Sequence, residues 1–367
     1  MKLWCAAFLW FCASIAATAS SFNGPPRVNL IALGPDGARA VLTYNQTWVE
    51  VDLFGGGAQV LEPPAACSWT SMAYAPGGED LAMSAFCAAP RGECGDAQAL
   101  LLAVGADRKR YRMIAETDAA RWSRLYWRGG QAAVLALETA LAAPMATNLS
   151  DLGKTTQDCE VGAPKLVSLN AENGRRIHLD LAPREWRYKN IVAASDDALI
   201  AEIAIARDGP ADTSAARDLI ALCAIDPRHT LCMSSSVAVE LLWQNGDWRF
   251  ATLPDHARRG RMLASADLTV IGQERCEARW VEERFRPVCF IEILADGELS
   301  REITAPDGLF GDMAMSDDGQ WLLAVSAGVG RRLKQFDLFN TATGARRAFP
   351  DLLTLSPPFL TKAEADR

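Results

Sequence analysis

The chain has 367 residues with 37 basic and 45 acidic side chains, and its net charge at pH 7 is −8. This acidic balance excludes nonspecific binding to nucleic acid, which needs a basic surface. The length allows one large buried core, and a closed β architecture of this size forms a single domain.

The first 19 residues have the pattern of a secretory signal. Lys2 precedes an apolar run from Leu3 to Ala17, and Ala17-Thr18-Ala19 supplies the small residues of a cleavage site. An uncleaved membrane anchor is the alternative, but a span needs about 20 apolar residues, and this run is short and rich in Ala, Ser and Thr. We expect cleavage after Ala19, a mature single domain 20–367 of net charge −9, no integral membrane span, and a secreted or periplasmic location.

Six times along the chain a short apolar strand meets a tight turn and continues into a second apolar strand. The turns are Gly34–Gly37, Ala75–Gly78, Trp127–Gly130, Ser195–Ala198, Ser265–Leu268 and Ser316–Gly319. Pro, Asp and Gly adopt the backbone conformations of a reversal, and the flanking residues are strong β formers, so each unit is predicted to be a hairpin. The units recur at intervals of a blade-sized repeat, which is about 40 to 45 residues, or that length plus an insertion.

This spacing predicts an all-β fold, a six-bladed β-propeller. The blades are expected at approximately 28–61, 67–115, 120–181, 186–253, 260–303 and 309–350. Closing the ring removes the long exposed sheet edges of an open array. The strand Trp321–Val325 alternates too little to be half exposed, so we expect it to be buried on both faces. Insertions at 141–165 and 207–217 are candidate partner-binding loops.

Two of the hairpins resemble the blade signature of TolB-type, WD-repeat-like β-propellers. They are Gly34-Pro35-Asp36-Gly37-Ala38-Arg39-Ala40-Val41 and Ser316-Asp317-Asp318-Gly319-Gln320-Trp321-Leu322-Leu323-Ala324. The resemblance covers roughly residues 28–350 and implies six blades around a central channel and a role in binding other molecules. We expect the propeller only, without the small α/β domain that precedes it in TolB. The signature also resembles the propellers of prolyl-oligopeptidase-type peptidases, but no hydrolase domain is expected after Phe349.

Eight cysteines follow the signal segment, an even number that fits an oxidising compartment. Hairpin geometry favours the pairs Cys276–Cys289 and Cys223–Cys232. Cys87 with Cys94 and Cys67 with Cys159 are predicted for the others, and these last two assignments are interchangeable. The cysteines form no Cys-Xaa-Xaa-Cys motif, so a structural role is predicted rather than a metal site.

Conventional catalytic signatures are missing from the sequence, and we expect no cofactor. Its three histidines, His178, His229 and His256, are each predicted to be surface or loop residues, with His178 on the polar face of an outer strand. The basic cluster Arg108-Lys109-Arg110 is predicted to be a solvated loop. Trp186 and Trp280 stand among charged residues and are the candidate surface anchors for a partner.

Equivalent positions of the six inner strands are predicted to form a polar rim around the channel. These positions are Asn29, Ser71, Ser123, Asn190, Arg261 and Asp312. Such a ring would bind a peptide, a small polar ligand or a cation, or would only satisfy water and backbone groups. A slip of one residue in register would exchange these positions with their neighbours.

Two functions follow from these patterns. The preferred one is an exported, non-catalytic propeller that binds a protein or peptide. The alternative is a hydrolase or lactonase-like enzyme, in which Asp312, Asn29 and Asn190 would hold Ca²⁺ in the channel.

Overall fold

The computed structural model describes residues 28–44, 47–87, 98–128, 132–141, 160–206, 212–233, 236–252, 258–281, 284–306, 308–327 and 333–353. The predicted signal segment, Cys94, Cys159, His256, most of the insertion at 141–165 and the first part of the insertion at 207–217 lie outside these residues. The signal peptide and its cleavage therefore remain a prediction.

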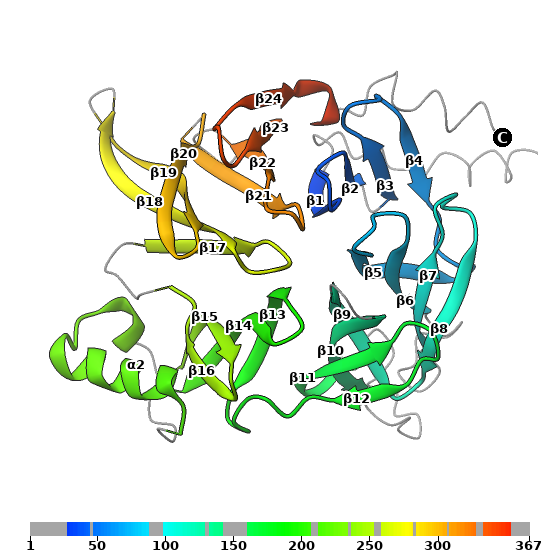
Figure 1. Cartoon of the computed structure of the whole chain (residues 1–367), viewed down its shortest axis with the longest axis horizontal. Helices are drawn as coiled ribbons and strands as arrows, with labels where there is room; N and C mark the ends of the chain where they lie inside the picture. Colours follow the sequence, from blue (N-terminus) through cyan, green and yellow to red (C-terminus); the bar gives the residue numbers. More distant parts are fainter. Residues whose placement is uncertain are drawn as a thin grey trace, which may run out of the picture.

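The described residues form six antiparallel sheets of four strands each, arranged around one axis (Figure 1). Blades 1 to 3 comprise β1 (Val28–Leu33), β2 (Arg39–Tyr44), β3 (Thr47–Asp52), β4 (Ala58–Leu61), β5 (Cys67–Tyr74), β6 (Leu81–Cys87), β7 (Gln98–Val104), β8 (Tyr111–Thr117), β9 (Ala120–Arg128), β10 (Ala133–Leu141), β11 (Glu160–Asn170) and β12 (Arg176–His178). Blades 4 to 6 comprise β13 (Arg187–Ala194), β14 (Ala198–Ala206), β15 (Ser236–Gln244), β16 (Asp247–Phe250), β17 (Arg258–Ala264), β18 (Val270–Val281), β19 (Arg284–Ala295), β20 (Glu298–Thr304), β21 (Leu309–Met315), β22 (Trp321–Ala327), β23 (Leu333–Asn340) and β24 (Arg346–Phe349).

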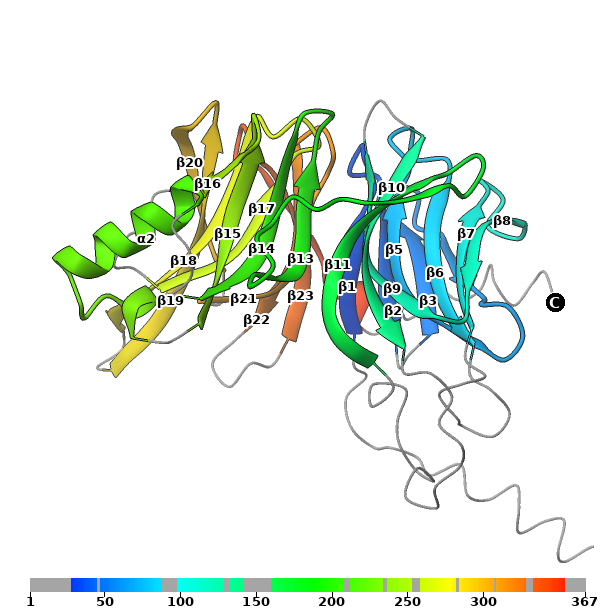
Figure 2. The same ribbon diagram turned by 90° about the horizontal axis from the view of Figure 1, so that it is seen from below.

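The first strand of every sheet lies at the axis. The inner strands β1, β5, β9, β13, β17 and β21 each contact the next, and β21 contacts β1. The side view shows the sheets standing upright around the axis, so their hairpin turns lie at its two ends (Figure 2). The ring closes, and the predicted six-bladed β-propeller is confirmed.

The core lies between neighbouring blades. Leu42 and Val51 of blade 1 pack with Leu323, Val325 and Phe336 of blade 6, and all five are fully buried. Leu322 to Ser326 are also buried, which confirms that this strand is covered on both faces. Apolar packing between the last blade and the first therefore closes the ring.

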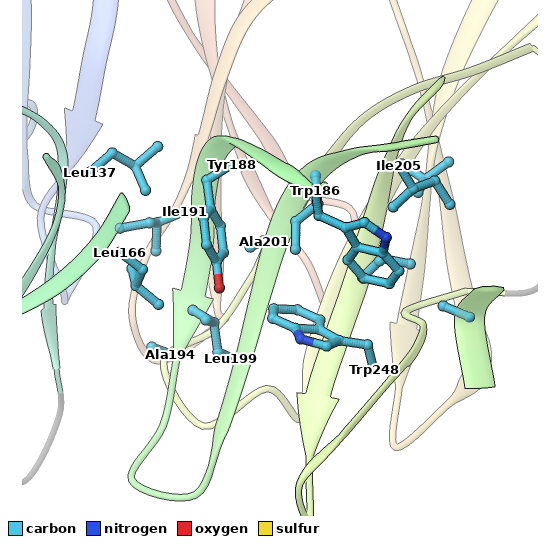
Figure 3. Close-up of a cluster of buried hydrophobic side chains, with 14 of the residues drawn as sticks. Leu137, Leu166, Trp186, Tyr188, Ile191, Ala194, Leu199, Ala201, Ile205 and Trp248 are labelled. Carbon is cyan, nitrogen blue, oxygen red and sulfur yellow. The ribbon is translucent and has the colours of Figure 1, made fainter. Parts of the chain in front are cut away.

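A second apolar cluster joins blades 3 and 4 (Figure 3). Trp186, predicted to be a surface anchor, is 4% exposed there, and its ring centroid lies 6.4 Å from that of Trp248. The prediction was wrong because Trp186 lies in the connection between the two blades, where its indole fills the space between them while Arg184 and Glu185 remain exposed. The side chain of Trp280 is not among those that the structure describes.

One α-helix interrupts the all-β pattern among the described residues. Helix α2 (Ser214–Ile225) begins within the insertion at 207–217, and the Thr213 hydroxyl accepts a hydrogen bond from the Ala216 amide at its N-terminus. Two 3₁₀ turns, η4 (Thr230–Cys232) and η5 (Pro350–Leu353), complete the elements. Neither α2 nor the short turns have the length and apolar character required to span a bilayer.

Three disulfides are present among the described residues. Cys223–Cys232 and Cys276–Cys289 are the pairs that the sequence predicts. Cys67 pairs with Cys87, so the predicted partners of both, Cys159 and Cys94, were wrong. Cys67 and Cys87 lie directly opposite each other on β5 and β6 with their Cα atoms 3.9 Å apart, so the strand register brings the two sulfur atoms within bonding reach.

Candidate functional site

All six predicted rim residues lie on inner strands, near the axis where the blades meet. In every inner strand the pairing register shifts at or beside the predicted position, because the inner strand carries an extra residue there. Such β-bulges leave an unpaired backbone group and redirect the neighbouring side chains. Each bulge adds one residue to the inner strand, so a register predicted from the sequence can be shifted by one residue at these positions.

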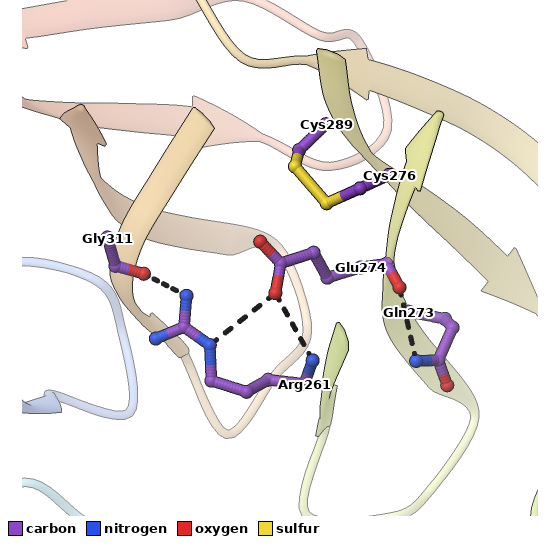
Figure 4. Close-up of a disulfide and its surroundings, with 6 residues drawn as sticks. All are labelled: Arg261, Gln273, Glu274, Cys276, Cys289 and Gly311. Carbon is purple, nitrogen blue, oxygen red and sulfur yellow. Dashed lines mark hydrogen bonds and ion pairs between the residues drawn. A yellow bond between two sulfur atoms is a disulfide. The ribbon is translucent and has the colours of Figure 1, made fainter. Parts of the chain in front are cut away.

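Arg261 connects rim residues of blades 5 and 6, and the contacts continue through Asp312 to blade 1. Its guanidinium lies 3.5 Å from the Glu274 carboxylate and donates a hydrogen bond to the Gly311 carbonyl (Figure 4). The guanidinium also lies 3.6 Å from the Asp312 carboxylate. The second Asp312 oxygen accepts from the Leu30 amide at 3.2 Å. This chain of contacts therefore ties three consecutive blades together at the axis.

The bulges explain why these side chains are polar. Glu274 accepts from the Arg261 amide at 3.2 Å, and a Cβ on Gly260 would lie 2.2 Å from the same carboxylate oxygen, so only glycine leaves room for it. On the other side of the ring, the Ser71 hydroxyl accepts from the Leu125 amide in the bulge of β9 at 2.9 Å. Side chains of adjacent strands thus satisfy backbone groups that the bulges free from the ladder.

The other rim residues have partners within their own blade. The Asn29 amide donates to the Thr43 hydroxyl at 3.1 Å, and Ser123 donates to the Leu137 carbonyl at 3.4 Å. Asn190 is half-buried and pairs with Glu202 across the sheet. The structure therefore brings Arg261 and Asp312 into direct contact and gives the remaining four separate partners.

Beyond the rim, the turns that follow the inner strands form a ring at one end of the propeller. The five turns that the structure describes in full lie at the same end because the inner strands run in the same direction. The Ala266 amide donates to the Asp317 carbonyl at 2.8 Å, Arg39 donates to the Gly78 carbonyl at 2.6 Å, and Arg128 donates to the Ser195 carbonyl at 2.6 Å. These bonds link blade 5 to 6, 1 to 2, and 3 to 4. We call this surface the turn end.

Glycines allow the turns to overlap closely. Gly37 has a φ of 72°, and a Cβ there would lie 2.4 Å from the indole of Trp321 in the preceding blade. Gly319 has a φ of 70°, and its Cβ would lie 2.8 Å from the Val270 Cβ. No side chain fits at either position, so the turns are closely packed against the neighbouring blades there.

The turn end carries an excess of carboxylates. They are Asp36, Asp196, Asp197, Asp267, Asp317 and Asp318. Burial, and then the charge of Asp318, raises the pKa of Asp317 to about 6. Burial also raises the pKa of Tyr126 in blade 3, and the negative charges of Asp317 and Asp267 add to that effect. These two aspartates lie on blades 6 and 5, whereas Tyr126 lies on blade 3.

Sequence reasoning used these aspartates only as turn formers and so missed the surface they make. The signal was present, since acidic residues recur within the repeated turns. Their convergence depends on the closed ring, which places equivalent turns side by side.

The histidines divide between surface and core. His178 is exposed on the outer strand β12, 3.9 Å from the Glu138 carboxylate, as predicted. His229 lies in a loop, one of the two predicted settings, but it is only 3% exposed and so is not a surface residue. It lies in the short segment bridged by Cys223–Cys232, and its Nδ1 accepts from the Leu231 amide at 3.2 Å. Closing this small loop over helix α2 buries the imidazole.

The predicted basic loop also differs from expectation. Lys109 and Arg110 are exposed, but the Arg108 side chain is 1% exposed and donates to both oxygens of Glu50 at 2.7 and 2.9 Å. Arg108 lies in the turn between β7 and β8 of blade 2, while Glu50 lies on β3 of blade 1. The prediction failed because only the neighbouring blade supplies the carboxylate.

Near the rim, the groups that could bind a metal ion already take part in other bonds. Among the described residues, Glu274, Cys276 and Cys289 place ligand atoms within 4.8 Å of one another. The two cysteines are joined in a disulfide and so offer no thiolates (Figure 4). Both oxygens of Asp312, a ligand in the predicted Ca²⁺ alternative, already face Arg261 or the Leu30 amide.

No protein-family model and no curated protein sequence matches the chain. Among solved structures it is similar to TolB from Acinetobacter baumannii, with 12% identity and a TM-score of 0.47 over 94% of this chain and 69% of that one. The β-propeller domain of the Trilobed protease from Pyrococcus furiosus has 9% identity and a TM-score of 0.48, over 89% and 98% of the two chains.

An oligogalacturonate lyase in complex with manganese has 11% identity and a TM-score of 0.46, covering 88% of this chain and 77% of that one. Identities and scores this low add no argument about function. The architecture follows from the chain itself, whose six four-stranded antiparallel sheets close around one axis as a six-bladed β-propeller.

Proposed function

We propose that this chain is an exported, non-catalytic β-propeller that binds a protein or peptide partner in the cell envelope or the extracellular space. The observation that carries the proposal is the turn end, where the hydrogen-bonded turns form a rigid surface around the axis. A preformed surface loses little conformational entropy when a partner binds.

The charge of the turn end indicates the chemistry of the partner. Its six aspartates are accompanied by the guanidinium groups of Arg39 and Arg128, which donate to backbone carbonyls. The surface is therefore acidic, and a segment rich in Lys or Arg complements it and is attracted from a distance.

Export is supported by two independent features. The first 19 residues have the pattern of a cleavable signal. Three disulfides occur among the described residues, and structural disulfides persist in oxidising compartments.

Calorimetric titration with a basic peptide, Ac-Lys-Ala-Lys-Ala-Lys-NH₂, and its glutamate counterpart tests the proposal. We compare the wild type with the triple variant Asp36→Asn, Asp196→Asn, Asp318→Asn, which keeps the size of each turn residue and one oxygen that can accept the hydrogen bonds of the turn. The matched control carries the same change in net charge at exposed positions away from the turns of the inner strands: Glu172→Gln, Asp218→Asn and Glu298→Gln.

The basic peptide is expected to bind the wild type and the control alike, and to bind the turn variant at least about 10-fold more weakly. Its affinity should fall between about 50 and about 500 mM salt, because exposed charges are screened. Equal binding to all three proteins, or equal binding of the glutamate peptide, contradicts the proposal. Stoichiometric Ca²⁺ in the purified protein, lost in Asp312→Ala, would favour the enzyme alternative.

A further inference from the structure

A pocket of about 300 Å³ opens between blades 3 and 4. Its walls are apolar and come from both blades and from the segment that connects them. The apolar lining residues are Leu135, Leu166, Leu179, Leu181, Ala194 and Leu199. Leu135, Leu166 and Leu199 are at most 4% exposed and belong to the cluster drawn in Figure 3, so the base of the pocket is part of the packed core.

The mouth of the pocket is polar and belongs to the turn end. Asp196 and Asp197 lie there in the turn between β13 and β14, with Asn245 and the half-buried Trp243 beside them. The Arg128 guanidinium also lines the mouth, but it is held by the carbonyls of Ser195 and Asp196. Two aspartates and one arginine leave the mouth with a net negative charge.

This combination points to one kind of occupant. A pocket of this size with leucine walls accepts a whole aromatic side chain, whose burial is strongly favourable. The acidic mouth favours a cation directly beside it, and the indole of Trp243 offers an aromatic surface. A buried aromatic anchor in a pocket, within an interface whose rim is polar, is a common form of a binding hot spot.

Building on the proposed function, we propose that this pocket is the specificity site of the turn end and receives an aromatic side chain of the partner, flanked in the partner sequence by Lys or Arg. The acidic turns attract the basic segment, and the pocket selects the aromatic residue within it.

Three tripeptides test this inference by calorimetric titration of the intact protein: Ac-Lys-Trp-Lys-NH₂, Ac-Lys-Ala-Lys-NH₂ and Ac-Ala-Trp-Ala-NH₂. The basic tryptophan peptide is expected to bind at least about 10-fold more tightly than the basic alanine peptide, the difference that burial of one aromatic ring supplies. Asp196→Asn is expected to weaken both basic peptides by about two- to threefold.

The pocket is then filled by Leu179→Trp, at a half-buried lining residue. The matched control is Leu299→Trp on β20, where the leucine is 61% exposed. Filling should abolish the preference for tryptophan and leave the alanine peptide unaffected, whereas the control should behave as wild type. If Leu179→Trp fails to fold, as judged by circular dichroism, Ala198→Leu fills the pocket from blade 4, because Ala198 at the start of β14 also lines it.

The outcomes separate the inference from the proposed function. If both basic peptides bind equally, or if the preference for tryptophan survives filling, the pocket inference is overturned while the acidic surface stands. If the basic alanine peptide does not bind but the neutral tryptophan peptide binds and is lost on filling, the pocket stands and the basic partner is overturned.

Discussion

Two arginine and glutamate pairs join neighbouring elements of this propeller, and they differ in burial. Arg108 and Glu50 lie between blades 1 and 2 with side chains 1% and 8% exposed, and Tyr74 donates to the same carboxylate at 2.9 Å. At the axis, the Arg261 side chain is 45% exposed beside Glu274 and Asp312. The first pair is therefore buried in the packing between blades 1 and 2. At the axis, the charge of Arg261 is accessible to solvent.

The difference follows from the surroundings of each pair. Besides the Glu50 carboxylate, Arg108 donates to the Gly105 and Glu79 carbonyls. Burial, and then the charge of Glu50, raises the pKa of Tyr74 well above its ordinary value, so this hydroxyl stays protonated and keeps donating. A buried, fully bonded group is costly to disrupt, whereas an exposed pair is weakened by water and salt.

The largest effect is expected from Arg108→Met, which removes the buried cation beside Glu50 and leaves only the partly exposed Arg39, 4.0 Å from the carboxylate. We expect a loss of about 3 to 5 kcal/mol in the free energy of unfolding. The control Arg110→Met, two residues away at a side chain that is 89% exposed, should cost less than about 1 kcal/mol. Urea denaturation of both variants measures the difference. Equal midpoints would show that the buried pair does not stabilise the contact between blades 1 and 2.

The disulfide Cys276–Cys289 is expected to contribute more to the free energy of unfolding than the ion pairs of Arg261 do. Replacing Cys276 and Cys289 together by Ala removes a bridge across 13 residues and should cost about 3 kcal/mol. The measurement is the same urea midpoint, taken with and without reductant. A double variant as stable as the oxidised wild type would mean that the hairpin of blade 5 does not depend on its disulfide.

Asp317 provides a third case, a carboxyl largely buried at the turn end. Its pKa is raised from 3.8 to about 6 in the folded protein, so the folded state binds its proton more tightly than the unfolded state does. The contribution of this group to stability therefore falls as pH rises from about 4 to about 6 and is constant above that.

Asp317→Asn should remove this pH dependence and make the protein more stable than wild type at pH 7, by at most about 3 kcal/mol. Unfolding at about pH 4.5 and pH 7 measures the change. The control Asp196→Asn retains Asp317 and hence its pH dependence. If Asp317→Asn changes the stability relative to wild type by the same amount at both pH values, the raised pKa is contradicted.

The smallest effect is expected from Arg261→Ala. Because the side chain is 45% exposed, its ion pairs should contribute about 1 kcal/mol or less. Denaturant unfolding at low and high salt measures this. If Arg261→Ala lowers the free energy of unfolding as much as Arg108→Met does, the two pairs do not differ as proposed. The ion pairs at the rim would then contribute strongly to stability.

The fold was predictable because its signals are local. Alternating apolar residues and the turns at Gly34–Gly37 and Ser316–Gly319 act over a few residues, so hairpins and their number follow from sequence. The disulfides Cys223–Cys232 and Cys276–Cys289 close short segments for the same reason. Cys67–Cys87 escaped prediction because the intervening hairpin register places them opposite each other, and a shorter sequence separation pointed to Cys94.

The candidate site was predictable only in part. The rim positions were placed on inner strands, but the bulges that redirect them were not foreseen, since a bulge arises from pairing with the second strand. The burial of Trp186, His229 and Arg108 likewise depends on residues that a linear pattern does not bring together.

The amino-acid sequence alone determined the repeat, the strands and the turns, because short-range backbone preferences and alternation encode them. Tertiary structure decided which charges are buried, how the turns converge into an acidic surface, and where a pocket opens between blades 3 and 4. Those properties come from contacts between side chains far apart in the chain, and only closure of the ring brings them within reach of one another.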